Sequence, residues 1–129
     1  MKNNALIIGG IVVLALAVGA FVYFADSGKT PVGSAELDTF AQCLKDKGAV
    51  FYGAFWCPHC QATKAMFGSS AKLLPYVECS NPDGKTQTQV CIEKGIKSYP
   101  TWEFSDGTQL TGERTLQELA DKTTCALPE

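Results

Sequence analysis

The most informative stretch of the sequence is residues 51–60, Phe51-Tyr52-Gly53-Ala54-Phe55-Trp56-Cys57-Pro58-His59-Cys60. The run from 49 to 56 is apolar and aromatic, as expected of a strand that is buried on both faces of a sheet. Residues 61–67 are compatible with a helix, so Pro58 falls in its first turn, where the missing N–H costs nothing. The two cysteines are therefore expected where a strand passes into a helix.

Cys57 and Cys60 have the spacing of a redox pair. Disulfide exchange needs a thiolate, and a free thiol with a pKa of about 8.5 is mostly protonated at neutral pH. A helix N-terminus offers Cys57 unpaired N–H donors and the positive end of the helix dipole, while Cys60, one turn later, can attack a mixed disulfide. We expect Cys57 to be the attacking thiol and Cys60 the resolving thiol. A protonated His59 would favour the Cys57 thiolate further and make the disulfide a stronger oxidant.

An inert disulfide and half of a metal site are the alternative interpretations of this pair. Zinc needs further ligands at close spacing, but Cys79 and Cys91 are separated by eleven residues and His59 is the only histidine. We therefore expect no metal site. Nucleic-acid binding is not expected either, because the lysines are scattered singly and the chain after residue 25 has a net charge of −3.

The rest of the chain alternates between helical and extended patterns. We expect helices over 34–47, 86–94 and 115–124, strands over 74–79, 99–104 and 110–112, and turns at 81–85 and 105–108. This order predicts an α/β fold, a mixed sheet flanked by helices, in one domain over residues 34–129. Tyr52 and Phe55 are assigned to its core.

Residues 5–25 form an uncharged apolar run that is long enough to cross a hydrocarbon layer of about 30 Å as a helix. Its length and its aromatic end favour a transmembrane anchor (residues 1–25) over a cleaved signal peptide, with 26–33 as a tether. Lys2 before the span gives a weak bias for an internal N-terminus. Six cysteines in a short domain suit an oxidising compartment. We therefore expect a single-pass protein of the cell membrane with an extracytoplasmic C-terminal domain.

Three segments of the sequence are similar to one known family. They are residues 51–60, 74–80 (Leu-Pro-Tyr-Val-Glu-Cys-Ser) and 96–102 (Ile-Lys-Ser-Tyr-Pro-Thr-Trp). Together they resemble the thioredoxin-like domain that is fused to bacterial homologues of vitamin K epoxide reductase. The resemblance covers residues 51–119 and implies a thioredoxin fold, no bound cofactor, and electron exchange between the cysteine pair and a quinone-linked membrane oxidoreductase. With one predicted span, we expect that vitamin K epoxide reductase-like partner to be a separate protein.

The resemblance also implies roles for residues outside the cysteine motif. Pro100 would be a cis-proline that faces the cysteines, and the backbone of Tyr99 would pair with a substrate strand. Trp56, Tyr99 and Trp102 could form an apolar rim for unfolded substrates, although a core position is favoured for Trp102. Cytosolic-type thioredoxins carry a buried acid where this chain has Phe51. Glu103 is a candidate substitute, and an ordinary exposed strand residue is the favoured interpretation of it.

The other four cysteines leave several pairings open, because six cysteines allow 15 connectivities. The family pattern pairs Cys79 with Cys91, which leaves Cys43 and Cys125 for each other. We expect both pairs to be structural. The alternative is that Cys79 and Cys91 relay electrons to the Cys57–Cys60 pair.

These observations predict a membrane-anchored, extracytoplasmic thiol:disulfide oxidoreductase that acts on protein thiols and disulfides. A quinone-linked membrane partner would recycle it. Two other functions stay open: a thioredoxin-like module that handles copper or haem, and a disulfide-stapled binding domain without redox turnover.

Overall fold

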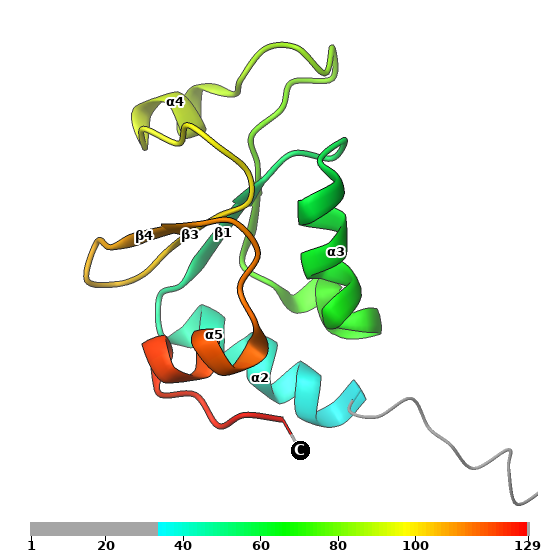
Figure 1. Ribbon diagram of the computed structural model, residues 1–129, viewed down its shortest axis with the longest axis vertical. Coiled ribbons are helices and arrows are strands. Elements are labelled where there is room, and N and C mark those ends of the chain that lie inside the picture. Colours follow the sequence, from blue (N-terminus) through cyan, green and yellow to red (C-terminus); the bar gives the residue numbers. More distant parts are fainter. Residues whose placement is uncertain (1–33, 129) are drawn as a thin grey trace, which may run out of the picture. The chain divides into compact units, whose positions relative to one another are not determined.

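The computed structural model describes residues 34–128 of the chain, so the expected anchor (1–25) and tether (26–33) lie outside the described residues. The elements, shown in Figure 1, are α2 (Ser34–Asp46), β1 (Val50–Gly53), α3 (Pro58–Met66), the 3-10 helix η1 (Gly68–Leu73), β2 (Tyr76–Glu78), α4 (Gln89–Glu93), β3 (Thr101–Glu103), β4 (Gln109–Thr111) and α5 (Leu116–Thr123). Within 34–128, no helix is long and apolar enough to cross a membrane.

The sheet has four strands in the order β2-β1-β3-β4. β1 runs parallel to β2 and antiparallel to β3, and β3 pairs antiparallel with β4. The parallel pair needs a crossover, and α3 with η1 supplies it. The strand that leads into the cysteine motif therefore lies in the interior of a mixed sheet, and the mixed α/β fold expected from the sequence is confirmed.

The larger core lies on the sheet face of Phe51. The ring of Phe51 stacks on Trp102 with centroids 4.8 Å apart, and both side chains are fully buried. Helices α2, α3 and α5 cover this face with buried side chains that include Phe40, Leu44, Cys60, Phe67, Leu119 and Ala120. Trp102 is therefore a core residue, as favoured from the sequence, and not part of a substrate rim.

A smaller cluster lies on the opposite face, around Tyr52. It contains the disulfide between Cys79 and Cys91, together with Ile96. Because α4 is only five residues long, this disulfide and the cluster around it hold the 79–96 segment to the sheet. In Figure 1 this segment stands at the end of the sheet away from α2 and α5.

A second disulfide joins Cys43 of α2 to Cys125, just after α5. The two cysteines are 82 positions apart in the sequence and their Cα atoms are 6.0 Å apart. This is the pair that remained once the family pattern had joined Cys79 to Cys91, and it ties the first described helix to the end of the domain.

The order of helices and strands is as predicted, but several elements are shorter. The strand expected over 49–56 ends at Gly53, because Cys57 N–H closes a turn on the Ala54 carbonyl and Phe55 N–H bonds to a side chain. The helix expected from 86 starts at Gln89, since Asp83 binds the backbone N–H groups of residues 85 and 86. Helix η1 was not predicted.

The assignment of Phe55 to the core is wrong. Its side chain is 50% exposed. Phe55 follows the last residue of β1 and lies in the turn that leads to Cys57, so the alternation of the strand no longer sets its direction. An apolar run in the sequence does not show where the strand inside it ends.

Candidate active site

Cys57 occupies the N-cap of α3, where its extended backbone (φ −77°, ψ 117°) joins the turn after β1 to the helix. Its Sγ accepts a hydrogen bond from the Cys60 N–H at 3.3 Å, and Pro58 takes the first helical position. Among residues 34–128, Cys57 and Cys60 are the free cysteines. The pair therefore stands at a strand-to-helix junction with a backbone donor aimed at the first sulfur, which is a setting that stabilises a thiolate.

Cys60 lies deeper than its partner and is 1% exposed. Burial, and after it the hydrogen bond with Cys57, raise the pKa of Cys60 to about 12, against the opposing effects of the Ala54 backbone and the charge of Lys64. At neutral pH this sulfur is held as a thiol. Cys57 is also buried, at 4% exposure, but it occupies the N-cap whereas Cys60 lies inside α3, so the two sulfurs have different surroundings, as an attacking and a resolving thiol require.

The peptide bond between Tyr99 and Pro100 is cis. Pro100 is fully buried, and the Cys57 thiol lies 3.7 Å from the Tyr99 carbonyl oxygen, to which it donates. The segment before β3 thus borders the first sulfur. The structure brings Tyr99 and Pro100 to the cysteine pair, where the family resemblance had placed them.

Trp56 forms an exposed edge of the site. Its side chain is 49% exposed, its indole N–H donates to Ser80 Oγ at 2.8 Å, and its ring meets Tyr99 edge-on at 6.0 Å. An open hollow beside it is lined by Trp56, Ser80, Lys85, Thr86, Gln87, Ile96, Lys97 and Tyr99. An extended chain bound along Tyr99 would have this hollow next to it.

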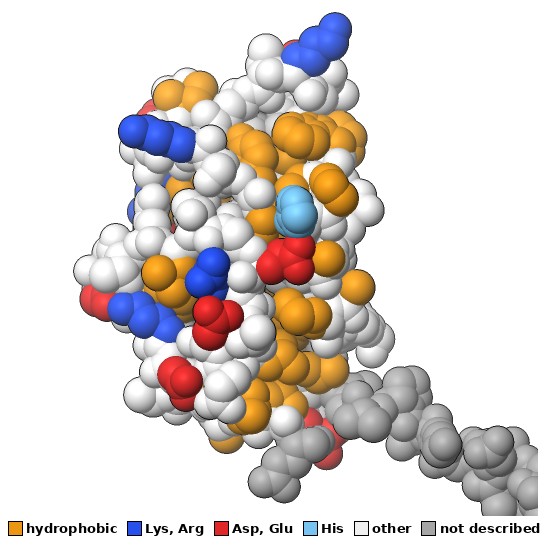
Figure 2. Space-filling view, in the orientation of Figure 1, with side chains coloured by type: hydrophobic (Ala, Val, Ile, Leu, Met, Phe, Trp, Pro, Cys, Tyr) orange, Lys and Arg blue, Asp and Glu red, His pale blue; other side chains and the backbone are white. Residues whose placement is uncertain are grey.

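His59 projects from the surface and pairs with Glu113, 54 positions later in the sequence. Its Nδ1 lies 2.5 Å from Glu113 Oε1, with the side chains 67% and 45% exposed. Figure 2 shows this histidine, in pale blue, against a red acidic side chain and amid orange hydrophobic side chains. The sequence motif indicated His59 but nothing in it pointed to Glu113.

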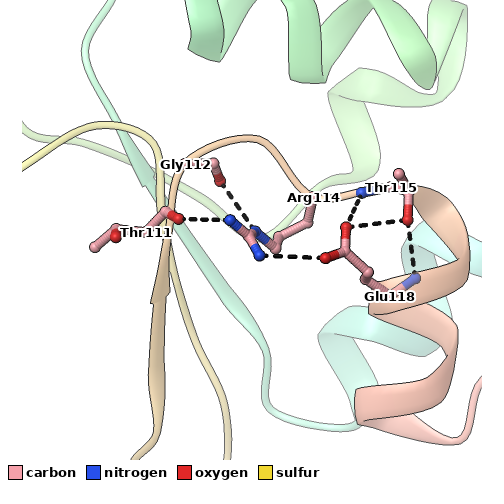
Figure 3. A network of polar contacts seen from close by, with 5 residues as sticks. All are labelled: Thr111, Gly112, Arg114, Thr115 and Glu118. Carbon is pink, nitrogen blue, oxygen red and sulfur yellow. Dashed lines mark hydrogen bonds and ion pairs between the residues drawn. The ribbon is translucent and has the colours of Figure 1, made fainter.

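The segment that carries Glu113 is held in place by its neighbours (Figure 3). The Arg114 guanidinium donates to the Thr111 and Gly112 carbonyls and pairs with Glu118 at 3.2 Å. Glu118 in turn forms a capping box with Thr115 at the start of α5. The loop between β4 and α5 therefore presents Glu113 to the motif on a fixed support.

Glu78 at the end of β2 is a site residue that the sequence analysis missed. Its Oε1 accepts from the Phe55 and Ser80 N–H groups at 3.1 and 2.9 Å, and its Oε2 accepts from the Tyr76 hydroxyl at 2.7 Å. Glu78 is the register partner of Gly53, so it braces the turn that leads to Cys57. The one signal in the sequence was an acid within the short apolar segment 74–79.

Glu103 does not stand in for a buried acid beside Cys60. It is the register partner of Val50 and pairs with Lys94 at 2.7 Å, with Gln109 also donating to it. This places it on the Tyr52 face of the sheet, whereas Cys60 packs on the Phe51 face. The favoured interpretation, an ordinary exposed strand residue, agrees with the place of Glu103 in β3 but not with its exposure, because its side chain is only 16% exposed.

Within residues 34–128, no three side chains of His, Cys, Asp or Glu come together as a possible metal site.

A protein-family model named Thioredoxin matches residues 32–124. The chain belongs to the thioredoxin family. The match covers α2 to α5 and includes both cysteines of the motif.

Two relatives of this thioredoxin-family chain agree with that assignment. Thiol-disulfide oxidoreductase LTO1 of Arabidopsis thaliana is 46% identical over 94 residues, 69% of this chain and 24% of the relative. Protein disulfide isomerase-like 5-1 of Oryza sativa subsp. japonica is 27% identical over 116 residues, 82% of this chain and 79% of the relative. The chain thus spans about a quarter of the first relative. Family and relatives support the expected enzyme class, a thiol-disulfide oxidoreductase.

Proposed function

We propose that this thioredoxin-family protein is a membrane-anchored, extracytoplasmic thiol:disulfide oxidoreductase that acts on protein thiols and disulfides. The observation that carries the proposal is the position of Cys57. Its sulfur accepts a hydrogen bond from the Cys60 N–H at the start of α3. The same sulfur lies next to the carbonyl oxygen of Tyr99, the residue before cis-Pro100. Backbone N–H donors at a helix N-terminus favour the thiolate form of a cysteine, which is the nucleophile in disulfide exchange.

The chemistry follows from the two sulfurs. When the protein reduces a substrate, the Cys57 thiolate attacks the substrate disulfide and releases one substrate thiolate. Cys60 then loses its proton and attacks Cys57, so that the Cys57–Cys60 bond forms, the mixed disulfide breaks and the second substrate sulfur leaves as a thiolate. When the protein oxidises a substrate, the same steps run in reverse and Cys60 leaves as the thiolate.

Exposed apolar side chains near the motif suit unfolded or extended protein substrates. Phe55 and Trp56 are both about half exposed, and Gly84 of the neighbouring loop lies close to both rings. The Tyr99 backbone beside Cys57 offers the polar edge that an extended peptide needs. A partner strand along Tyr99 would thus place its cysteine next to Cys57.

The compartment and partner are inferred from other features. The disulfides Cys43–Cys125 and Cys79–Cys91 suit an oxidising compartment, and the apolar run 5–25 suits an anchor on the domain's N-terminal side. The motif segments resemble the domain fused to vitamin K epoxide reductase homologues. We therefore propose recycling by a quinone-linked membrane protein of that kind.

The reduction potential of the Cys57–Cys60 disulfide tests the function. The full chain is equilibrated with glutathione buffers and the two thiols are quantified. A potential near about −120 mV would make the protein a donor of disulfides, and one near about −270 mV would make it a reductant. If no reversible couple appears, the redox function fails and the stapled binding domain takes its place.

Trapping tests the partner. A full chain with Cys60→Ser cannot resolve a mixed disulfide, so membranes that contain it should accumulate a covalent adduct at Cys57 with a quinone-linked protein. The Cys57→Ser, Cys60→Ser double variant is the matched control and should trap nothing. Adducts with soluble exported proteins alone would support the substrate class and contradict the proposed membrane partner.

A further inference from the structure

Cys60 faces a specific difficulty in the proposed reaction. It must lose its proton to attack the mixed disulfide, and it must leave as a thiolate in the opposite direction. Yet Cys60 is 1% exposed, and burial disfavours the charged form of a thiol. A positive charge held close to this sulfur would offset that penalty.

Gly53 opens the space next to Cys60. A Cβ atom at Gly53 would lie 3.0 Å from Cys60 Sγ and 2.8 Å from Tyr76 Cε2. The Tyr76 ring and the Cys60 sulfur therefore both border the space that a side chain at position 53 would fill. The edge of this ring is part of the surroundings of the resolving sulfur.

Lys64 places a cation over the face of the Tyr76 ring. It lies four residues after Cys60 on α3, hence on the same side of the helix. Its Nζ is 3.4 Å from the centroid of the Tyr76 ring, a distance at which the ring face attracts an ammonium. The charge of Lys64 also opposes the rise in the pKa of Cys60.

Glu78 completes the arrangement at the hydroxyl end of the Tyr76 ring. It accepts the Tyr76 hydroxyl hydrogen bond at 2.7 Å, and its other oxygen is held by the Phe55 and Ser80 N–H groups. A phenol that donates to a carboxylate is polarised by it, which strengthens the attraction of the ring for a cation. The ring of Tyr76 is thus fixed in position by β2 and the turn before Cys57.

We infer that Lys64, held over the ring of Tyr76, is the positive charge that supports the Cys60 thiolate during exchange. The inference deepens the proposed function and rests on it. In the resolving step the Cys60 proton passes to solvent, Sγ of Cys60 bonds to Sγ of Cys57, and the substrate sulfur leaves as a thiolate that takes up a proton. Lys64 keeps its proton throughout and acts by its charge, as a positioning residue for this step.

A coloured aromatic disulfide, dithiobis-nitrobenzoate, separates the two thiols in one measurement. Added to the full chain with only the Cys57–Cys60 pair reduced, it gives a first release of coloured thiolate when Cys57 attacks and a second when Cys60 resolves. Lys64→Met, which keeps the apolar stem without the charge, should slow the second release by about three- to tenfold near pH 8 and leave the first unchanged. Its rate profile should move to higher pH, because more alkaline solution is then needed to ionise Cys60.

Three further variants sharpen the result. Lys64→Arg should restore the second release, and Tyr76→Phe should slow it less than Lys64→Met, because the ring remains without its bond to Glu78. Lys45→Met on α2 removes an exposed lysine of another helix and should change neither phase. A normal second release in Lys64→Met, or equal slowing of both phases, would overturn the inference and leave the proposed function standing. If the unmodified chain shows no first release, the proposed function fails and the inference fails with it.

Discussion

At the scale of single residues, Gly53 is the position where a side chain cannot be added without moving a neighbour. The close approaches to Tyr76 and Cys60 predict that Gly53→Ala destabilises the protein by about 1–3 kcal/mol, as overpacking does. Urea unfolding of the full chain measures this. The double variant Gly53→Ala, Tyr76→Leu removes the ring atom that the new Cβ would meet, so the two changes should couple favourably in a double-mutant cycle. A loss below about 0.5 kcal/mol in the single variant contradicts the expected clash.

His59 is the residue within the motif expected to tune the redox pair. A protonated imidazole in the first turn of α3 would favour the Cys57 thiolate and hence the reduced form. His59→Ala should therefore lower the reduction potential, by on the order of 30 mV for a tenfold change in the equilibrium constant. Equilibration with glutathione buffers gives the value. His59→Gln is the matched variant, since it keeps a donor for Glu113 without the charge, and it should shift the potential in the same direction. A rise in potential in either variant counts against this role.

At the scale of elements, the capping box at the start of α5 supports the loop that presents Glu113. The Thr115 hydroxyl oxygen accepts a hydrogen bond from the Glu118 N–H, and the Glu118 carboxylate accepts one from the Thr115 N–H. Thr115→Ala should cost about 1 kcal/mol of stability, because a helix N-terminal donor loses its acceptor. Chemical denaturation measures this, with Thr115→Ser as the control that keeps the hydroxyl. Equal stability of the two variants would mean that the cap contributes nothing.

At the scale of the whole molecule, the two structural disulfides close loops of very different length. Cys43 and Cys125 are 82 positions apart and Cys79 and Cys91 are 12 apart. Loop-closure entropy predicts a loss of about 4–5 kcal/mol for the Cys43→Ala, Cys125→Ala variant and about 3 kcal/mol for Cys79→Ala, Cys91→Ala. Denaturant unfolding under oxidising conditions measures both. A Cys79→Ala, Cys91→Ala variant that loses turnover at unchanged stability would instead support the electron relay.

Local patterns in the sequence predict much of this domain. The order of helices and strands, the buried strand before the motif, Pro58 in the first turn of α3 and the core position of Trp102 all follow from apolar periodicity and proline geometry. The cis peptide before Pro100 and the Cys79–Cys91 pair came from family resemblance, which left Cys43 and Cys125 for each other, because chain physics alone favours a trans bond and allows 15 cysteine pairings.

Other features were decided only by the tertiary structure. Phe55 is exposed because β1 ends at Gly53, three residues before the end of the apolar run 49–56. The support around the motif comes from Glu78 and Glu113, which lie 23 and 54 positions from the groups they contact. Periodicity reports which face of its own element a residue occupies, and it carries no information on which distant element will lie against that face. The sequence by itself thus determined the motif and its strand-to-helix setting, and the packing of β2, α3 and the loop before α5 decided which charges surround it.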